Sequence, residues 1–253
     1  MSTNKSKDEL IQHKNETLHK LNNFIQRKIN GSSIEKGKAD KFCYWIKDYI
    51  RFLNYENTFR DKCKQKKARR YKRGEILKVH LGYNIGSEEG GLHYCVVITK
   101  NDNPSNPVLT VIPLTSVKEH TNITKLPYGS LSLGDDLYTA TEAKITFQID
   151  SLTKQMVDIQ MEYNEFKDND IESLNRISAK LELVRINLDN CKKAQKEFDK
   201  MKRGSIALVN QITTISKIRI VDPKTSTDPL TGIKLSVDNL ELIDKMIIQN
   251  YTK

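Results

Sequence analysis

The sequence predicts an α+β protein, in which a small β-barrel follows a helical region and is interrupted by a long antiparallel helical hairpin. Three observations indicate this class. Residues 73–116 alternate β-branched runs with glycine- and asparagine-rich turns, which is typical of strands. Residues 1–70 and 142–202 carry apolar residues at helical spacing, and strand-type sequence returns after them. We therefore expect a helical region at 1–70 and a barrel domain at 71–253, with the hairpin at 142–202 inserted into the barrel.

The first 70 residues are predicted to form two helices. A capping-box pattern from Ser6 to Glu9 starts the first helix, and Gly31 ends it. A second capping box, from Ser32 to Glu35, starts the next helix. The apolar face of that second helix is the strongest core stripe of the region and consists of Phe42, Trp45, Ile46, Tyr49 and Leu53. These helices have three possible roles, which are binding the hairpin, extending a dimer interface and inhibiting the protein.

The segment 62–73 contains eight basic residues and no acidic one, with Tyr71 among them. One interpretation is binding to a nucleic-acid backbone, and the other is a solvated linker ahead of the first strand. The formal net charge of +10 favours polyanionic partners, because neutralising phosphates releases counterions. Charge alone does not separate RNA from DNA.

A three-stranded meander is predicted next. The first strand covers 76–81, and the other two cover 94–98 and 108–114, with a turn-forming Asn-Asp-Asn-Pro sequence at 101–104 between them. The loop after the first strand contains four glycines, Gly82, Gly86, Gly90 and Gly91. Because glycine permits sharp turns and close approach of a ligand to the backbone, this loop is a candidate site.

Heptad spacing predicts the helical hairpin. Residues 122–138 suit one more strand and a loop before it. The first seam consists of Ile145, Ile149, Leu152, Met156, Ile159, Tyr163 and Phe166. The second seam consists of Ile177, Leu181, Val184, Leu188, Cys191 and Phe198. A polar break at 167–170 separates the two helices, so the second is expected to run back along the first.

The end of the chain is expected to complete the sheet. Residues 203–220 return to alternating strand sequence. Ser236 then caps a final helix that bears Leu240, Ile243 and Ile247. This helix either covers the barrel or a partner chain, or it is a frayed tail.

Several classes of protein are disfavoured by the sequence. The four cysteines are widely spaced, and no group has metal-ligand spacing, so we expect neither a metal nor another cofactor. No run approaches the eighteen or so apolar residues of a membrane span, and the first residues lack the apolar stretch of a secretory signal. We expect a cytoplasmic protein with no membrane partner.

Four ordered blocks of sequence resemble one family. They are Lys72-Arg73-Gly74-Glu75, Gly86-Ser87-Glu88-Glu89-Gly90-Gly91 with the strand and Asn101-Asp102 after it, Pro113-Leu114-Thr115-Ser116, and the strand at 210–217. This order resembles the MazF/PemK-type endoribonuclease toxins of bacterial type II toxin–antitoxin systems. The resemblance covers 72 to about 127 and 203 to the end, and leaves the N-terminal helices and the hairpin unexplained.

The resemblance implies both fold and function. It implies an SH3-like barrel, a homodimer and a cognate antitoxin protein as partner. It also implies an mRNA interferase, an endoribonuclease that cleaves single-stranded RNA at preferred sequences without a metal. Such cleavage leaves a cyclic phosphate and a 5′-hydroxyl.

The site residues follow from matching positions, and one match departs from the family. The family arginine after the glycine pair, which is treated as catalytic, is His93 here, and Tyr94 replaces the proline that follows it. Histidine can act as general acid or base near neutral pH, so His93 is a candidate catalyst, although a histidine at a strand start can also be a surface donor. Ser87 and Thr115 match site positions, and their hydroxyls could orient the phosphate or serve only local structure.

Five further residues are predicted to contact RNA from the same matches, namely Lys72, Arg73, Glu89, Tyr94 and Gln211. The glutamine that often precedes the glycine pair is Glu89, and the arginine of the later strand is Thr213. With His93 in place of the other arginine, two family cations are absent. His80 on the first strand is either a second acid or base or a structural histidine. The missing arginine leaves a second hypothesis open, a non-catalytic nucleic-acid-binding or assembly protein that uses the barrel as a platform and the hairpin for partners.

Overall fold

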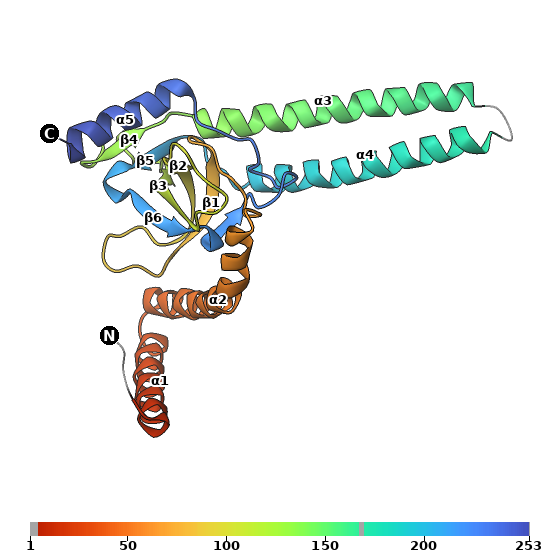
Figure 1. Ribbon diagram of the computed structural model, residues 1–253. Helices are drawn as coiled ribbons and strands as arrows, with labels where there is room; N and C mark the ends of the chain where they lie inside the picture. The colour runs from red at the N-terminus through yellow and green to blue at the C-terminus, as the bar shows by residue number, and fades with distance from the viewer. Residues whose placement is uncertain (1–4, 167–169, 253) are drawn as a thin grey trace. The chain divides into compact units, whose positions relative to one another are not determined.

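The computed structural model describes residues 5–166 and 170–252. The chain divides into two compact units, Met1–Asn54 and Tyr55–Lys253. No helix in the described part of the chain is long and apolar enough to cross a membrane. The second unit contains the sheet, the helical hairpin and the last helix, which are labelled in Figure 1.

Two helices, α1 (Lys7–Ile29) and α2 (Ser33–Lys64), account for most of the N-terminal region. The first capping box is confirmed, because Ser6 Oγ accepts from the Glu9 N–H and the Glu9 carboxylate accepts from the Ser6 N–H. At the second box the Glu35 N–H donates to Ser32 Oγ at 3.4 Å, but the Glu35 carboxylate binds Lys28 Nζ at 2.8 Å. Only half of that predicted box therefore forms.

The sheet is antiparallel and has seven strands. Their bounds are β1 (Ile76–Gly82), β2 (Gly91–Val97), β3 (Val108–Ser116), β4 (Ser130–Ser132), β5 (Ser205–Leu208), β6 (Thr213–Ser216) and β7 (Ile220–Asp222). The strand order is β4-β5-β3-β2-β1-β7, and β6 also pairs with β3. The predicted meander is confirmed as β1-β2-β3, and β5 to β7 join it after the hairpin.

The structure corrects the prediction of a closed barrel. β4 and β7 end the strand path, and within the described residues no ladder joins them. The edge of β1 that does not face β2 is occupied by two segments. β7 pairs with the middle of β1, and the segment 233–235 lies along its start, where the Ile76 N–H donates to the Ile233 carbonyl at 3.0 Å. The α+β class is thus confirmed, while the sheet remains open.

The core lies on both faces of the strands, because successive side chains point to opposite sides. On one face, Ile76, Val96 and Ile112 pack with the fully buried Ile243 of α5 (Val237–Tyr251). The predicted last helix therefore covers the sheet and is not a frayed tail. The opposite face buries a second cluster, which contains Tyr71, Leu77, Val79, Leu81, Cys95, Val97, Leu109, Val111, Ile215 and Ile220.

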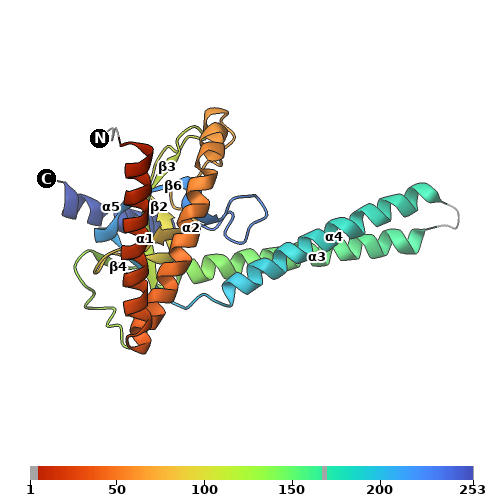
Figure 2. The ribbon, with the colours of Figure 1, turned by 90° about the horizontal axis from the view of Figure 1, so that it is seen from below.

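The hairpin forms as predicted, from α3 (Asp136–Glu165) and α4 (Ile171–Phe198), which lie side by side in both views (Figures 1 and 2). We call this pair the arm. It begins at Asp136, earlier than the predicted 142, and Asp170 caps α4 by accepting from the Ser173 N–H. The rest of the predicted break, 167–169, lies outside the described residues.

The predicted seam of the arm is too wide. Ile145, Leu152 and Ile159 are buried on α3, as are Ile177 and Cys191 on α4. Several other predicted seam residues are more than 40% exposed, namely Ile149, Met156, Tyr163, Leu181 and Leu188. Two helices bury only one narrow stripe of each other, so the second apolar row of each helix stays outside.

Candidate functional site

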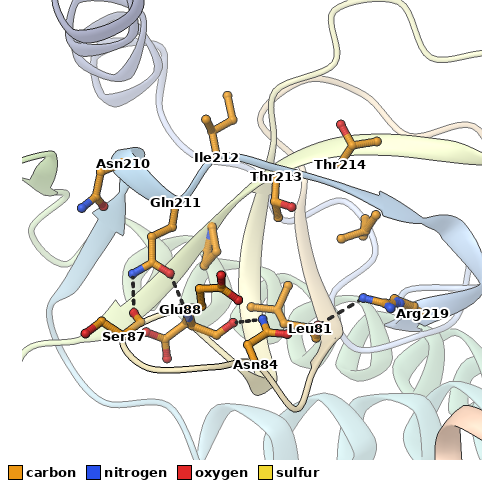
Figure 3. A pocket seen from close by; sticks show the side chains of 13 residues that line it. Leu81, Asn84, Ser87, Glu88, Asn210, Gln211, Ile212, Thr213, Thr214 and Arg219 are labelled. Carbon is orange, nitrogen blue, oxygen red and sulfur yellow. Dashed lines mark hydrogen bonds between the residues drawn. The ribbon is translucent and has the colours of Figure 1, made fainter.

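The glycine loop between β1 and β2 is held closed by a residue from the far end of the chain. Gln211 Oε1 accepts from the Glu89 N–H at 2.6 Å, and Gln211 Nε2 donates to the Ser87 carbonyl at 3.2 Å (Figure 3). Inside the loop, Asn84 Nδ2 donates to the Glu89 carbonyl at 2.7 Å. Glycine is favoured at position 90, because a Cβ there would lie only 3.0 Å from the Gly82 carbonyl oxygen.

A polar pocket of about 510 Å³ lies beside this loop, and Figure 3 shows the side chains that line it. Ser87, Glu88 and Glu89 come from the loop, and Gln211 comes from the short helix η1 (Val209–Gln211). Arg219 adds a cation and donates to the Leu81 carbonyl at 3.1 Å. We call this cavity the loop pocket.

His93 lies on β2 next to the loop, with an acceptor facing each ring nitrogen. Its Nε2 is 2.9 Å from Glu89 Oε1, and its Nδ1 is 3.4 Å from the carbonyl oxygen of Leu114. A carboxylate and a carbonyl can only accept, so the doubly protonated imidazolium satisfies both contacts. The geometry therefore suits proton donation by His93 better than proton abstraction, although the sequence left both roles open.

A second pocket, of about 190 Å³, lies on the other side of His93. It is lined by His93, Tyr94 and Thr115, which are three of the predicted site residues. β2 and β3 pair with Tyr94 opposite Leu114, so one step further along this register His93 faces Thr115. The pocket also contains three lysines, Lys78, Lys200 and Lys202. We call it the lysine pocket.

The arm is anchored beside the lysine pocket by the buried Glu197 near the end of α4. Its carboxylate pairs with Lys78 and accepts from the Tyr94 hydroxyl at 2.6 Å. Burial alone raises the pKa of Glu197, but the hydrogen bonds from Lys78 and Tyr94 outweigh it and hold the pKa below its usual value. Burial, and then the bond to Glu197, raise the pKa of Tyr94 well above its ordinary value, so Tyr94 stays a neutral donor.

The predicted site residues divide into three groups in space. Ser87, Glu89 and Gln211 line the loop pocket, whereas His93, Tyr94 and Thr115 line the lysine pocket. The contact between His93 and Glu89 joins the two pockets.

The remaining two predicted residues lie elsewhere. Arg73 is held by α5, because its guanidinium pairs with Asp244 and donates to the Ile98 carbonyl. Lys72 is exposed, and its N–H donates to Glu75 Oε2 at 3.1 Å. Both residues therefore make contacts that hold the start of the sheet in place. His80, on β1, pairs across the ladder with Leu92.

Sequence reasoning missed the cations of both pockets. Lys200 and Lys202 follow the arm by two and four residues, so nothing in their local sequence connects them with His93 more than 100 residues earlier. Lys78 and Arg219 lie on elements that the sequence did identify, but only the pairing of β1 with its neighbours shows which way they point. Among the described residues, no group of three or more histidine, cysteine, aspartate or glutamate side chains could hold a metal ion.

Comparison with known families agrees with the motifs. Residues 72–184 match the family model described as PemK-like, MazF-like toxin of type II toxin-antitoxin system. The resemblance that the motifs indicated is thereby confirmed for this stretch of the chain. The match ends within α4, ahead of β5, β6 and β7. No curated protein matches the chain.

Proposed function

We propose that this chain is the toxin of a toxin–antitoxin pair and acts as a metal-independent, sequence-preferring endoribonuclease on single-stranded RNA. The observation that carries the proposal is the pair of His93 and Glu89, 2.9 Å apart between two polar pockets. A proton donor with an adjacent carboxylate is what phosphodiester cleavage without a metal requires. The family that residues 72–184 match supports the reaction class.

In this proposal His93 is the general acid. The 2′-oxygen of the RNA attacks phosphorus, the bond to the 5′-oxygen breaks, and the imidazolium gives its Nδ1 proton to that leaving oxygen. This proton is held only by the long 3.4 Å contact to the Leu114 carbonyl. Glu89 orients the imidazole through its contact with Nε2. The proton of the 2′-hydroxyl goes to the carboxylate of Glu88 on the glycine loop, because Glu89 is engaged by His93. The products are a cyclic phosphate and a 5′-hydroxyl.

The lysine pocket supplies the charge that the missing family arginines would give. Lys200 and Lys202 are exposed at its edge, and Lys78 is tied to Glu197 in its wall. Cations fixed near a phosphate stabilise the additional negative charge of the transition state. Thr115 is placed to donate its hydroxyl to a phosphate oxygen. The loop pocket, with Ser87 and Gln211, is proposed to hold a base next to the cut.

The partners and location proposed for the chain follow from the family that residues 72–184 match. We propose a cognate antitoxin that blocks the two pockets, a homodimer as the working form, and action on mRNA in the cytoplasm.

Purified protein incubated with single-stranded RNA in EDTA tests the activity. The unsubstituted chain is expected to cut, and His93→Ala is expected to lower the cleavage rate about 10²- to 10⁴-fold, the usual contribution of an acid or base. His120→Ala is the matched control, because His120 is an exposed histidine that lines neither pocket. The readout is the cleavage rate together with the end groups of the fragments.

Two results would contradict the proposal at different points. RNA that stays intact with the unsubstituted chain across pH 5 to 8, around the reference pKa of about 6.5 for histidine, would favour the non-catalytic binding protein. Full cleavage by the His93→Ala variant would keep the reaction class but remove His93 as its acid.

A further inference from the structure

The arm has an apolar side that its two helices do not bury. On α3 this side consists of Ile149, Met156 and Tyr163, and on α4 it consists of Leu174, Leu181 and Leu188. Each set repeats every seven residues, and the six residues are between 42% and 63% exposed. A seven-residue repeat keeps side chains in one row along a helix that packs on another helix. We call these six residues the outer rows.

The contacts inside the arm show that the two outer rows lie on the same side of it. Ile145 and Leu152 of α3 pack with Cys191, Val184 and Phe198 of α4, which form an apolar half of the seam. The other half of the seam is polar, because Gln155 accepts from Asn187 at 3.1 Å and Glu162 pairs with Lys180. The arm's interface therefore has one apolar edge and one polar edge.

Each outer row adjoins the apolar edge. On α3 the row lies four residues after the buried series that begins at Ile145, and on α4 it lies three residues before the series that begins at Ile177. At about 100° per residue, a step of +4 residues moves a side chain about 40° around the helix axis. A step of −3 residues moves it about 60° in the same direction. In an antiparallel pair this places both rows next to the same edge, so they form one continuous apolar surface.

A second copy of the same chain matches this surface in size and spacing. Six half-exposed side chains of this kind present on the order of 600 Å², near the roughly 800 Å² per partner of a standard interface. Each row spans about 21 Å at 1.5 Å per residue, and a second arm offers rows with the same length and repeat. An isologous contact needs this self-complementarity.

The charges at the rims allow α4 of a second copy to lie on α3. Beyond its outer row, α3 carries the uncharged Thr146, Thr153 and Gln160. In the corresponding positions, α4 carries Ser178, Arg185 and Lys192, and the charge of Arg185 is paired with Glu182 on the same helix at 2.6 Å. Placing α4 of one copy on α3 of the other therefore brings no like charges of the two rims together.

We propose that two copies associate through the outer rows of their arms, with α3 of each copy packing on α4 of the other in a four-helix bundle. Burying the six apolar side chains drives the association. This contact uses none of the residues that line the two pockets, so its loss can be distinguished from a loss of the proposed ribonuclease chemistry.

Charge substitutions within the outer rows test the contact in the full chain. Tyr163→Glu and Leu181→Lys are each expected to halve the mass measured by sedimentation equilibrium, because each buries an unpaired charge in the interface. A mixture of the two variants is expected to regain the original mass, since the glutamate of one chain then meets the lysine of the other. Both positions are more than half exposed, so the fold of one chain tolerates the changes.

Matched controls carry the same charges on the opposite side of the arm. Met161→Glu and Ile186→Lys change exposed apolar residues of α3 and α4 that lie outside the outer rows, and they are expected to leave the mass unchanged. Equal loss of mass in the controls would overturn the proposal. So would an unaltered mass in both outer-row variants, a mixture that does not reassociate, or an unsubstituted chain that sediments only as a monomer.

Discussion

At the scale of single residues, Asp222 on β7 is a carboxyl group whose charged form is disfavoured by its surroundings. Burial raises the pKa of Asp222 to about 6, although its Oδ1 accepts from the Leu230 N–H at 3.0 Å. Asp228 and Glu197 also raise this pKa, while Lys144 lowers it. Lys144 Nζ is occupied by the Pro229 carbonyl at 2.6 Å, and burial lowers its own pKa. The folded protein therefore favours a neutral Asp222.

Replacing Asp222 with Asn is expected to stabilise the fold at pH 7. The amide keeps the acceptor for Leu230, and the partly exposed site screens the charge, so we expect a gain of about 1 kcal/mol. Because the folded pKa is raised from 3.8 to about 6, the charged form costs stability above pH 6. That cost disappears as the pH falls from 6 toward 4, and the gain of the variant disappears with it. Urea unfolding at pH 7, 5 and 4 measures the difference, and a gain that is constant with pH would contradict this account.

At the scale of elements, the basic segment before β1 is anchored by a buried ion pair. Lys217 Nζ lies 2.7 Å from Asp102 Oδ1, and their side chains are 2% and 0% exposed. The other oxygen of Asp102 accepts from the Tyr71 N–H at 2.8 Å. The segment is therefore part of the fold where Tyr71 is buried, whereas most of its lysines remain exposed to solvent.

Removing one member of this pair is expected to be costly. Lys217→Met leaves the carboxylate of Asp102 buried without a counter-charge, so a loss of about 3–5 kcal/mol is expected in denaturant unfolding. Adding Asp102→Asn should recover much of the loss, because the asparagine keeps the acceptor for Tyr71 and removes the charge. Lys224→Met, at an exposed lysine, is the control and should change little. A double variant no more stable than the single one would argue against the ion pair.

At the scale of elements, several helices and strands could be predicted from the sequence. Strands β1 to β3, the capped start of α1 and the arm follow from local periodicity and turn residues, because these patterns depend only on near neighbours. The outer rows, except Leu174, were wrongly assigned to the seam, because the spacing of apolar residues does not say how many helices they contact. The open sheet was missed because the segment 233–235, which pairs with β1, has no strand pattern of its own.

The site was predictable only where its residues are close in sequence. His93 and Glu89 are four residues apart and both lie in one motif. The clamp formed by Gln211 joins Glu89 across 122 residues, and its motif did not show which atoms it would bind. The lysines after the arm gave no signal, because their role depends on where α4 ends.

At the scale of the whole molecule, the segment that leaves the arm supplies two cations of the candidate site, Lys200 and Lys202. Replacing Lys200 and Lys202 with Gln is expected to weaken RNA binding and to reduce its salt dependence. Two lost phosphate contacts on a single strand lower the slope of log K against log salt by about 1.4. Lys154→Gln with Lys193→Gln removes the same charge from the arm itself and should leave the slope nearly unchanged. Titrations of labelled RNA at several salt concentrations measure both, and equal slopes for the two double variants would contradict a role for that segment in the site.

The hydrogen bonds of Gln211 to the glycine loop also determine when the loop can take its final form during protein synthesis. A ribosome that adds about 5–20 residues per second reaches Gln211 roughly 6–24 seconds after it has added His93. Throughout this interval the nascent chain has neither the clamp nor strand β5, which pairs with Thr115. A chain whose synthesis stops within the arm therefore never assembles the two pockets. The order of the elements along the chain therefore delays assembly of the two pockets until the residues after the arm have been added.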